Sequence, residues 1–326
     1  MTRNHYFALD KITAMIISFS KNPIKQIYGI VFWNFRAILF FAVCAAAAYI
    51  TLIEYKYDFV MLPPIPVSIL GGALAIFLGF RNSSAYDRWW EARKIWGAVV
   101  NDSRSLGMES LAYPRVKDAG EEKEIAEWRR RLIMRHIGWL YALNGHLRKN
   151  PADISAYVSQ DELEILSKKK NVPAQLLAIQ GKEVDYGHRR GWYDEFRFVE
   201  MMGTLKKFYD DQGKAERIKN TVFPYYYNYF TLFFLWLFTM SLPFALASLM
   251  DNWVMIPVSI LISFAFYILH KSGLITETPF EARAADTPLT TICRGIEIDL
   301  LEMIDESEIP PAENTIKTKF GVVYAS

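Results

Sequence analysis

The sequence predicts an all-α membrane protein with four transmembrane helices in two hairpins and a large helical domain between the hairpins. Four segments contain no Asp, Glu, Lys or Arg: Ala37–Ile53, Phe59–Phe80, Thr221–Met250 and Asn252–Leu269. Their lengths are near or above the roughly 20 residues that a helix needs to cross the hydrocarbon core. The mean hydropathy of the whole chain is only +0.07, because the charged residues of segment 81–220 offset the apolar spans.

Lys and Arg side chains collect on one side of the expected spans. The two short hairpin loops hold little positive charge, since the first contains only Lys56 and the second is Asp251-Asn252. The other connecting segments are richer in basic residues, and those before the first span are Arg3, Lys11, Lys21, Lys25 and Arg36. Because cytoplasmic loops carry an excess of Lys and Arg, we expect both termini and the middle segment in the cytoplasm.

Proline positions and loop lengths define the spans more closely. We expect the first span at about residues 30–53 and the second at 63–80, with the second helix beginning near Ile65. Proline is tolerated in the first helical turn, and three prolines mark that start: Pro63, Pro64 and Pro66. The two-residue turn Asp251-Asn252 makes the third and fourth spans antiparallel neighbours. Prolines expected at helix starts or kinks in these spans are Pro224, Pro243 and Pro257.

The segment between the hairpins has the periodicity of helices rather than strands. Apolar residues recur at helical spacing in segments 87–111 and 121–147, and further helices are expected at 159–170 and 196–212. Residues 171–173 and 187–191 are expected to be connections. The chain is therefore expected to divide into four parts: a first hairpin with its N-terminal segment (1–80), a cytosolic helical domain (81–220), a second hairpin (221–270), and a cytosolic C-terminal helix and tail (271–326).

Composition and motifs argue against several classes of protein. The net charge of +2 is too small for a nucleic-acid-binding surface. Cys44 lies in a span and Cys293 near the C-terminus, so we expect no disulfide. His136 and His146, ten residues apart, do not share a helix face and are expected to be one packed and one exposed histidine. We find no catalytic motif, no metal site and no cofactor motif. The N-terminal segment has no cleavable signal pattern, so the first span is expected to direct insertion.

An acidic group near the C-terminus is the nearest approach to a divalent-cation site. Its spacing lacks the ligand pattern and the glycine of an EF-hand loop, so we expect a solvated helix end. The residues of this group are Asp299, Glu302, Asp305, Glu306 and Glu308.

Residues 76–93, IFLGFRNSSAYDRWWEAR, resemble the bestrophin family, specifically its bacterial branch. The segment Glu216–Thr221 with Pro224, the pair Pro279-Phe280, and Cys293-Arg294 with Glu297 support this resemblance in the same order. It implies a homopentameric ion channel whose pore is lined by the second span. It further implies the bacterial inner membrane, with the subunit itself, monovalent ions and membrane lipid as partners, no nucleic acid and no cofactor.

The resemblance also assigns a hydrophobic neck to one face of the second span. The phenylalanine of FLGF matches the innermost neck position and is Phe80, and steps of four residues give Ile76 and Gly72. Positions four apart lie roughly on one helix face. Five copies of Ile76 and Phe80 would form stacked apolar rings that gate by dewetting. Packing between helices or against lipid is the alternative for these side chains. Gly72 replaces the usual bulky residue, so the outermost ring is expected to be wide or absent.

Two further positions concern ion selectivity. Arg81 follows Phe80, and a ring of five would favour anions at the inner mouth of the pore, although an interfacial anchor explains the same residue. The family's cytosolic aperture aligns with Phe196 beside Glu195, and a ring of Glu195 would favour cations. The sequence leaves the choice between chloride and sodium or potassium open.

Calcium control is where this chain departs from the animal members of the family. Animal bestrophins carry an acidic run directly after the Pro-Phe, which forms part of a calcium clasp. Here Pro279-Phe280 is followed by Glu281-Ala-Arg-Ala-Ala285. Alanine offers no oxygen ligand and Arg283 repels Ca²⁺, which requires several oxygen ligands. We therefore expect conduction that does not depend on calcium.

Two other classes of function remain open from the sequence. A carrier is disfavoured, because four spans hold no inverted repeat and no ionisable residue in mid-span. A non-conducting scaffold that recruits partners through its cytosolic helices is the main alternative, and a monomeric protein would favour it.

Overall fold

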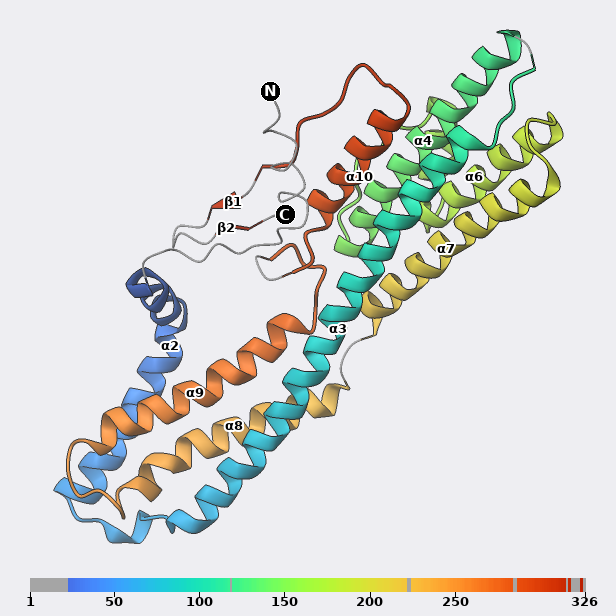
Figure 1. The fold of residues 1–326 in the computed structure, drawn as a ribbon. Coiled ribbons are helices and arrows are strands. Elements are labelled where there is room, and N and C mark those ends of the chain that lie inside the picture. Colours follow the sequence, from blue (N-terminus) through green and yellow to red (C-terminus); the bar gives the residue numbers. More distant parts are fainter. Residues whose placement is uncertain are drawn as a thin grey trace, which may run out of the picture.

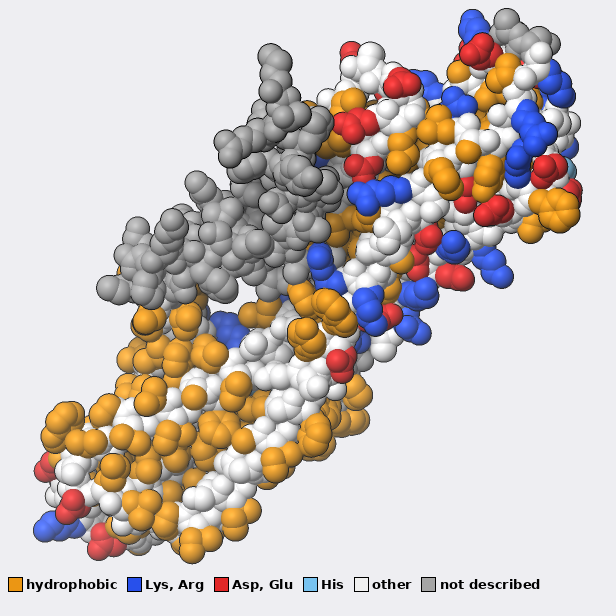
Figure 2. Space-filling view, in the orientation of Figure 1, with side chains coloured by type: hydrophobic (Ala, Val, Ile, Leu, Met, Phe, Trp, Pro, Cys, Tyr) orange, Lys and Arg blue, Asp and Glu red, His pale blue; other side chains and the backbone are white. Residues whose placement is uncertain are grey.

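The computed structural model describes residues 23–117, 119–221, 224–283, 286–314, 316–317 and 323–324. Its helices form an elongated molecule (Figure 1), and one end is apolar whereas the other is rich in charged side chains (Figure 2). Figure 2 shows hydrophobic side chains over the end made by α2, α8, α9 and the first part of α3, whereas charged side chains cover the opposite end.

Four helices are long and apolar enough to cross a membrane, as predicted. The first is α2 (Pro23–Tyr49), which continues as a π-helical turn over Ile50–Glu54 and is followed by a 3₁₀ turn at Asp58–Val60. The others are α3 (Pro64–Ala112), α8 (Tyr225–Leu246) and α9 (Met255–Thr276). Helix α3 packs against both α8 and α9, and α2 packs against the same pair (Figure 1).

Helix α3 is a single helix of 49 residues that leaves the apolar end and runs into the charged end (Figure 1). At 1.5 Å per residue it is about 73 Å long. The predicted helix at 87–111 is the second half of α3, because Asn82-Ser83-Ser84 does not interrupt the backbone. Asn82 instead donates its side-chain amide to the carbonyl of Leu269 in α9, at 3.1 Å.

The charged end is built from further helices around the second half of α3. These are α4 (Ala119–Arg148), α5 (Gln160–Ser167), α6 (Val172–Arg189), α7 (Glu195–Asn220) and α10 (Leu289–Met303). The fold class is all-α, as predicted, and two antiparallel two-residue strands accompany the helices near the C-terminus: β1 (Ile316–Lys317) and β2 (Val323–Tyr324).

Helix α6 was absent from the sequence prediction, which had connections at residues 171–173 and 187–191. Asn171 is the N-cap, and its side-chain oxygen accepts the N–H of Ala174. Pro173 fits because proline is tolerated in the first turn. The true connection to α7 is Arg190–Asp194, where Gly191 has φ +74°. Asparagine is a favoured N-cap residue, so Asn171 could have been read from the sequence as a helix start. This signal is stronger than the indication of a connection that Pro173 gave.

Large aromatic residues fill the core of the polar part. Trp96, Trp128, Trp139 and Trp192 are completely buried. His136 lies among them, hydrogen-bonds to Ser103 Oγ at 2.9 Å and is buried, whereas the side chain of His146 is 35% exposed. The prediction of one packed and one more exposed histidine is confirmed. Cys44 and Cys293 are both free cysteines in the structure.

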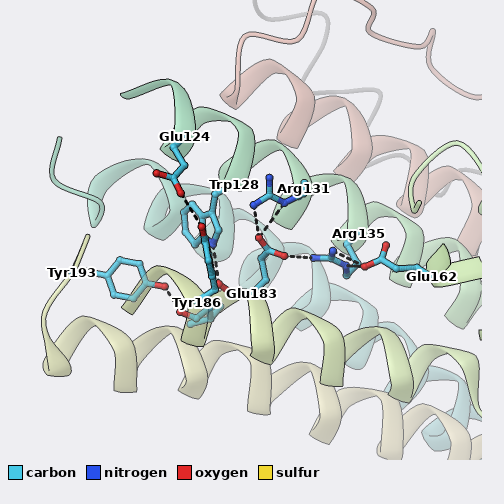
Figure 3. Close-up of polar contacts among 9 residues, drawn as sticks. Glu124, Trp128, Arg131, Arg135, Glu162, Glu183, Tyr186 and Tyr193 are labelled. Carbon is cyan, nitrogen blue, oxygen red and sulfur yellow. Dashed lines mark hydrogen bonds and ion pairs between the residues drawn. The ribbon is translucent and has the colours of Figure 1, made fainter. Parts of the chain in front are cut away.

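A network of arginines and glutamates joins α4, α5 and α6 (Figure 3). Glu183 of α6 lies 2.9 Å from Arg131 and 3.3 Å from Arg135 on α4. Arg135 also binds Glu162 of α5 at 2.6 Å, and its side chain is 7% exposed. Because each charge in this partly buried group has an opposite partner, the network stabilises one arrangement of the three helices.

Glu109 of α3 is a buried carboxyl group in the interface with α7. Its Oε1 accepts a hydrogen bond from Thr204 Oγ1 at 2.8 Å, while Oε2 has no partner. Burial raises the pKa of Glu109 from 4.5 to about 7, and the Thr204 hydrogen bond offsets part of this rise. The folded protein therefore holds a proton on Glu109 over a pH range in which the unfolded chain has lost it.

We expect wild-type protein to lose stability relative to Glu109→Gln as the pH rises. Below pH 4.5 the carboxyl is neutral in both the folded and the unfolded state, and above pH 7 it must ionise in the fold or keep its proton at a cost. The expected loss in the free energy of unfolding, relative to Glu109→Gln, is about 3 kcal/mol at pH 8. Thermal unfolding of both proteins at pH 5 and pH 8 measures it. Burial lowers the pKa of His136 to about 3, so His136 lowers the stability of the fold as the pH falls below 6.5. Both proteins contain His136, so this contribution cancels when they are compared. An equal difference at both pH values would contradict the prediction.

Candidate ion pathway

Among the residues that the structure describes, one face of α3 has no partner inside the subunit. Ile76 is 65% exposed and Phe80 is 69% exposed, although both belong to a membrane-spanning helix. Ile65 and Ile69, nearer the helix start on the same side, are equally open. The opposite face is buried against α8, through residues that include Val67, Leu74 and Leu78. Helix α3 therefore presents a continuous apolar stripe away from its own subunit.

Beyond Phe80 the same face of α3 is mixed, because exposed Trp90 lies among its polar residues. Positions at helical spacing along this direction are exposed, and they are Ser83, Asp87, Lys94 and Asn101. Lys94 pairs with Glu91 at 2.6 Å on the same helix. The stripe thus changes from an apolar surface within the span to a mixed polar and aromatic surface in the charged part, without a break in the helix.

The two adjacent glycines of α3 have different surroundings. A Cβ at Gly71 would lie 2.6 Å from the ring of Phe238, so this glycine allows close packing of α3 on α8. A Cβ at Gly72 would meet no atom of the described part of the chain within 4 Å. Gly72 lies on the exposed stripe, one turn before Ile76, and leaves that level of the stripe without a side chain.

Arg81 does not share the exposed face of Phe80, and a ring of Arg81 at the inner mouth stays a prediction. Its side chain is fully buried. The guanidinium lies 3.1 Å from Glu277 Oε2 and 2.9 Å from His270 Nδ1, on the α9 side of α3. Successive helix residues point about 100° apart, so Arg81 points inward where Phe80 points outward. The alternative, in which Arg81 is an interfacial anchor, is closer to the structure. Arg81, however, is buried inside the subunit and is held by residues at the end of α9.

Glu195 and Phe196 lie at the start of α7, at the end of the polar part farthest from the spans (Figure 1). Asp194 caps this helix by accepting the N–H of Arg197. The side chain of Glu195 is 71% exposed and lies 3.1 Å from His188 Nε2, while Phe196 is 87% exposed. Phe196 is therefore open to another subunit or a solvent-filled passage, whereas Glu195 is exposed but paired with His188.

The backbone of the segment after Pro279-Phe280 is hydrogen-bonded to a carboxylate of the same segment, that of Asp286. Oδ2 of Asp286 accepts the backbone N–H groups of Glu281 and Arg283, at 2.7 and 3.1 Å. Lys219 binds Glu281 at 2.7 Å. Two residues of the predicted departure from the calcium clasp, Ala284 and Ala285, lie outside the described residues. Within the described part of the chain, no group of His, Cys, Asp or Glu is arranged to hold a metal ion.

The acidic group near the C-terminus is partly neutralised by arginines. Asp299 of α10 pairs with Arg104 of α3 at 2.7 Å, and Glu306 pairs with Arg130 of α4 at 2.9 Å. These pairs tie α10 and the segment after it to the neighbouring helices.

Comparison with known proteins places this arrangement of helices in a family. The family described as bacterial/fungal bestrophin protein matches residues 15–302. The chain belongs to the bestrophin family. The voltage-dependent anion channel-forming protein YneE of Escherichia coli strain K12 is 36% identical over 75% of this bestrophin and 78% of that protein. YneE of Salmonella typhi is 32% identical over 91% of this chain and 92% of its own.

Solved structures resemble this bestrophin over most of its length. A crystal structure of a bacterial bestrophin homolog from Klebsiella pneumoniae has a TM-score of 0.76 at 27% identity, covering 83% of this chain and 98% of that one. A second crystal structure, of a variant of a membrane protein, has a TM-score of 0.78 at 26% identity, with 84% and 100% coverage. Together with the four apolar helices, the family makes this chain an integral membrane protein.

The sequence prediction missed the partners of Arg81. Glu277 and His270 are 196 and 189 residues away along the chain. The available signal was an arginine at the end of a span together with a histidine and a glutamate at the end of another, since charges at such positions are expected to be paired. The spacing alone does not say that the two ends meet.

Proposed function

We propose that this bestrophin assembles as a homopentamer into a passive channel for small monovalent ions, with α3 of each subunit lining the pore. The observation that supports it most is the exposed apolar stripe of α3, which runs from Ile65 to Phe80 and has few neighbours among the described residues of its own subunit. A single subunit with four spans is too small to enclose a pore. A ring of copies brings the five stripes to one axis.

The neck of this pore consists of Ile76 and Phe80, with Gly72 as a wider level outside them. Rings of apolar side chains hold water poorly when they are narrow, so they act as a gate without a charged group. The wide apolar stripe makes lipid the alternative neighbour of these side chains. The match to the bestrophin family supports the pore over lipid for these side chains.

The sign of the conducted ion depends on rings on either side of the neck. The YneE relatives are named as anion channel-forming proteins, and this favours chloride. A second candidate is a cation channel. Arg81 is buried in the subunit, which argues against a basic ring at the inner mouth, whereas the acidic side chains of Asp87 and Glu195 are exposed. Phe196 beside Glu195 would narrow the cytosolic aperture.

We place the protein in the bacterial inner membrane, with both termini and the domain 81–220 in the cytoplasm. The distribution of Lys and Arg supports this orientation. Conduction is proposed to be independent of calcium, because the carboxylate of Asp286 is engaged by backbone N–H groups of its own segment.

Single-channel recording in planar bilayers under asymmetric NaCl tests the proposal. We expect ion currents that are the same with and without a calcium chelator. Reversal near the chloride potential makes the protein an anion channel, and reversal near the sodium potential makes it a cation channel through Asp87 or Glu195. Currents that vanish with the chelator would contradict calcium independence. Silence of both wild type and Phe80→Ala, with a monomeric purified protein, would favour the non-conducting scaffold.

A further inference from the structure

The inner end of the neck is tied to α9 by a buried charged cluster. Arg81, the residue after Phe80, is fully buried and contacts Glu277 at 3.1 Å and His270 Nδ1 at 2.9 Å. The side chain of Glu277 is only 12% exposed. The guanidinium donates to His270 Nδ1, so this ring nitrogen acts as the acceptor. Arg81, which directly follows Phe80 of the neck, therefore contacts two residues at the C-terminal end of α9, His270 and Glu277.

The contacts around this cluster leave α3 little freedom to turn against α9. Arg88, two turns further along α3, donates to the backbone carbonyl of Glu277 at 3.1 Å and to that of Ile218 at the end of α7 at 2.8 Å. A Cβ at Gly273 would collide with Oδ1 of Asn82, so the two helices touch there. The ends of α7 and α9 are thus both attached to α3 just beyond the neck.

A helix rotates as one body, so the direction of Arg81 determines the direction of Phe80. The two side chains leave the helix about 100° apart. Turning Phe80 away from the pore would pull the guanidinium from Glu277 and leave a buried carboxylate without its partner. Removing one partner of a buried pair is strongly unfavourable.

We propose that Arg81, Glu277 and His270 position the neck, because they hold α3 at the rotation at which Phe80 faces the pore. This inference rests on the proposed channel function. The sequence prediction gave Arg81 an electrostatic role in the permeation path, whereas a buried, paired arginine acts through the helix that carries it.

The experiment compares Glu277→Gln with wild type in single-channel recordings. We expect a several-fold higher open-state occupancy in Glu277→Gln, because Phe80 is no longer held at the pore axis. Glu277→Asp, which keeps the charge, is expected to restore part of the wild-type gating. Asp299→Asn is the matched control, since it removes a different carboxylate partner of α3, that of Arg104, and we expect it to gate like wild type.

The same substitution in a Phe80→Ala background separates positioning from general damage. Without the neck side chain, Glu277→Gln has nothing to reorient and is expected to leave the open-state occupancy unchanged. An equal effect in both backgrounds would overturn the proposal. If Glu277→Gln does not fold, His270→Gln tests the same cluster with the ion pair retained, and a smaller change in the same direction is expected. Wild-type gating in a folded cluster variant would also overturn it. If Phe80→Ala alone changes no current, the neck itself is wrong, which is a different failure.

Discussion

Replacing Phe80 with alanine is expected to raise the single-channel current several-fold. Phe80 is 69% exposed on the stripe and makes the innermost apolar ring in the proposed pentamer. Alanine widens that ring, so water and ions enter a segment that the larger side chain keeps dry. Ile76→Ala is expected to change the current in the same direction and by less, because isoleucine is the smaller side chain. Single-channel recording at matched voltage measures both variants.

The matched control is a leucine on a different span. Leu39 of α2 is 59% exposed on the apolar surface and does not belong to α3. Leu39→Ala removes an exposed apolar side chain of similar size to Ile76 from a surface that we expect to meet lipid, so its current is expected to equal that of wild type. Unchanged currents in both Ile76→Ala and Phe80→Ala would remove the neck from α3.

Replacing Gly72 with isoleucine is expected to lower the current strongly. Gly72 lies on the stripe one turn before Ile76, and a Cβ there meets none of the described atoms of its own subunit within 4 Å. Isoleucine adds a third apolar ring at a level that is now wide, and a longer dry segment is harder for ions to cross. The fold is expected to tolerate the change, because glycine is among the poorest helix-forming residues.

A graded series provides the control for this prediction. Gly72→Ala, Gly72→Val and Gly72→Ile add increasing volume at one position, so the current is expected to fall in that order. Gly71→Ala tests the neighbouring position, where the new methyl group would approach Phe238. That variant is expected to lower the thermal stability of the protein, since overpacking a filled interface is unfavourable. A current that is independent of side-chain size at Gly72 would place this position outside the pore.

The four spans and most of the long helices were predictable because their signals are local. The absence of charge over the spans and the periodic apolar residues of α4 depend only on neighbours along the chain. The motif at residues 76–93 identified the family for a similar reason, since it is contiguous. The error at α6 was also local, because a proline was given more weight than the capping asparagine before it.

The sequence by itself determined the membrane spans, the polar domain between them and the family, because charge and periodicity act through adjacent residues. Only the tertiary structure decided that Arg81 turns inward while Phe80 and Ile76 stay exposed. That difference depends on where the end of α9 meets α3, and Glu277 and His270 reach Arg81 from nearly 200 residues away. No local pattern encodes which two helix ends touch, since the contact results from the packing of all four spans.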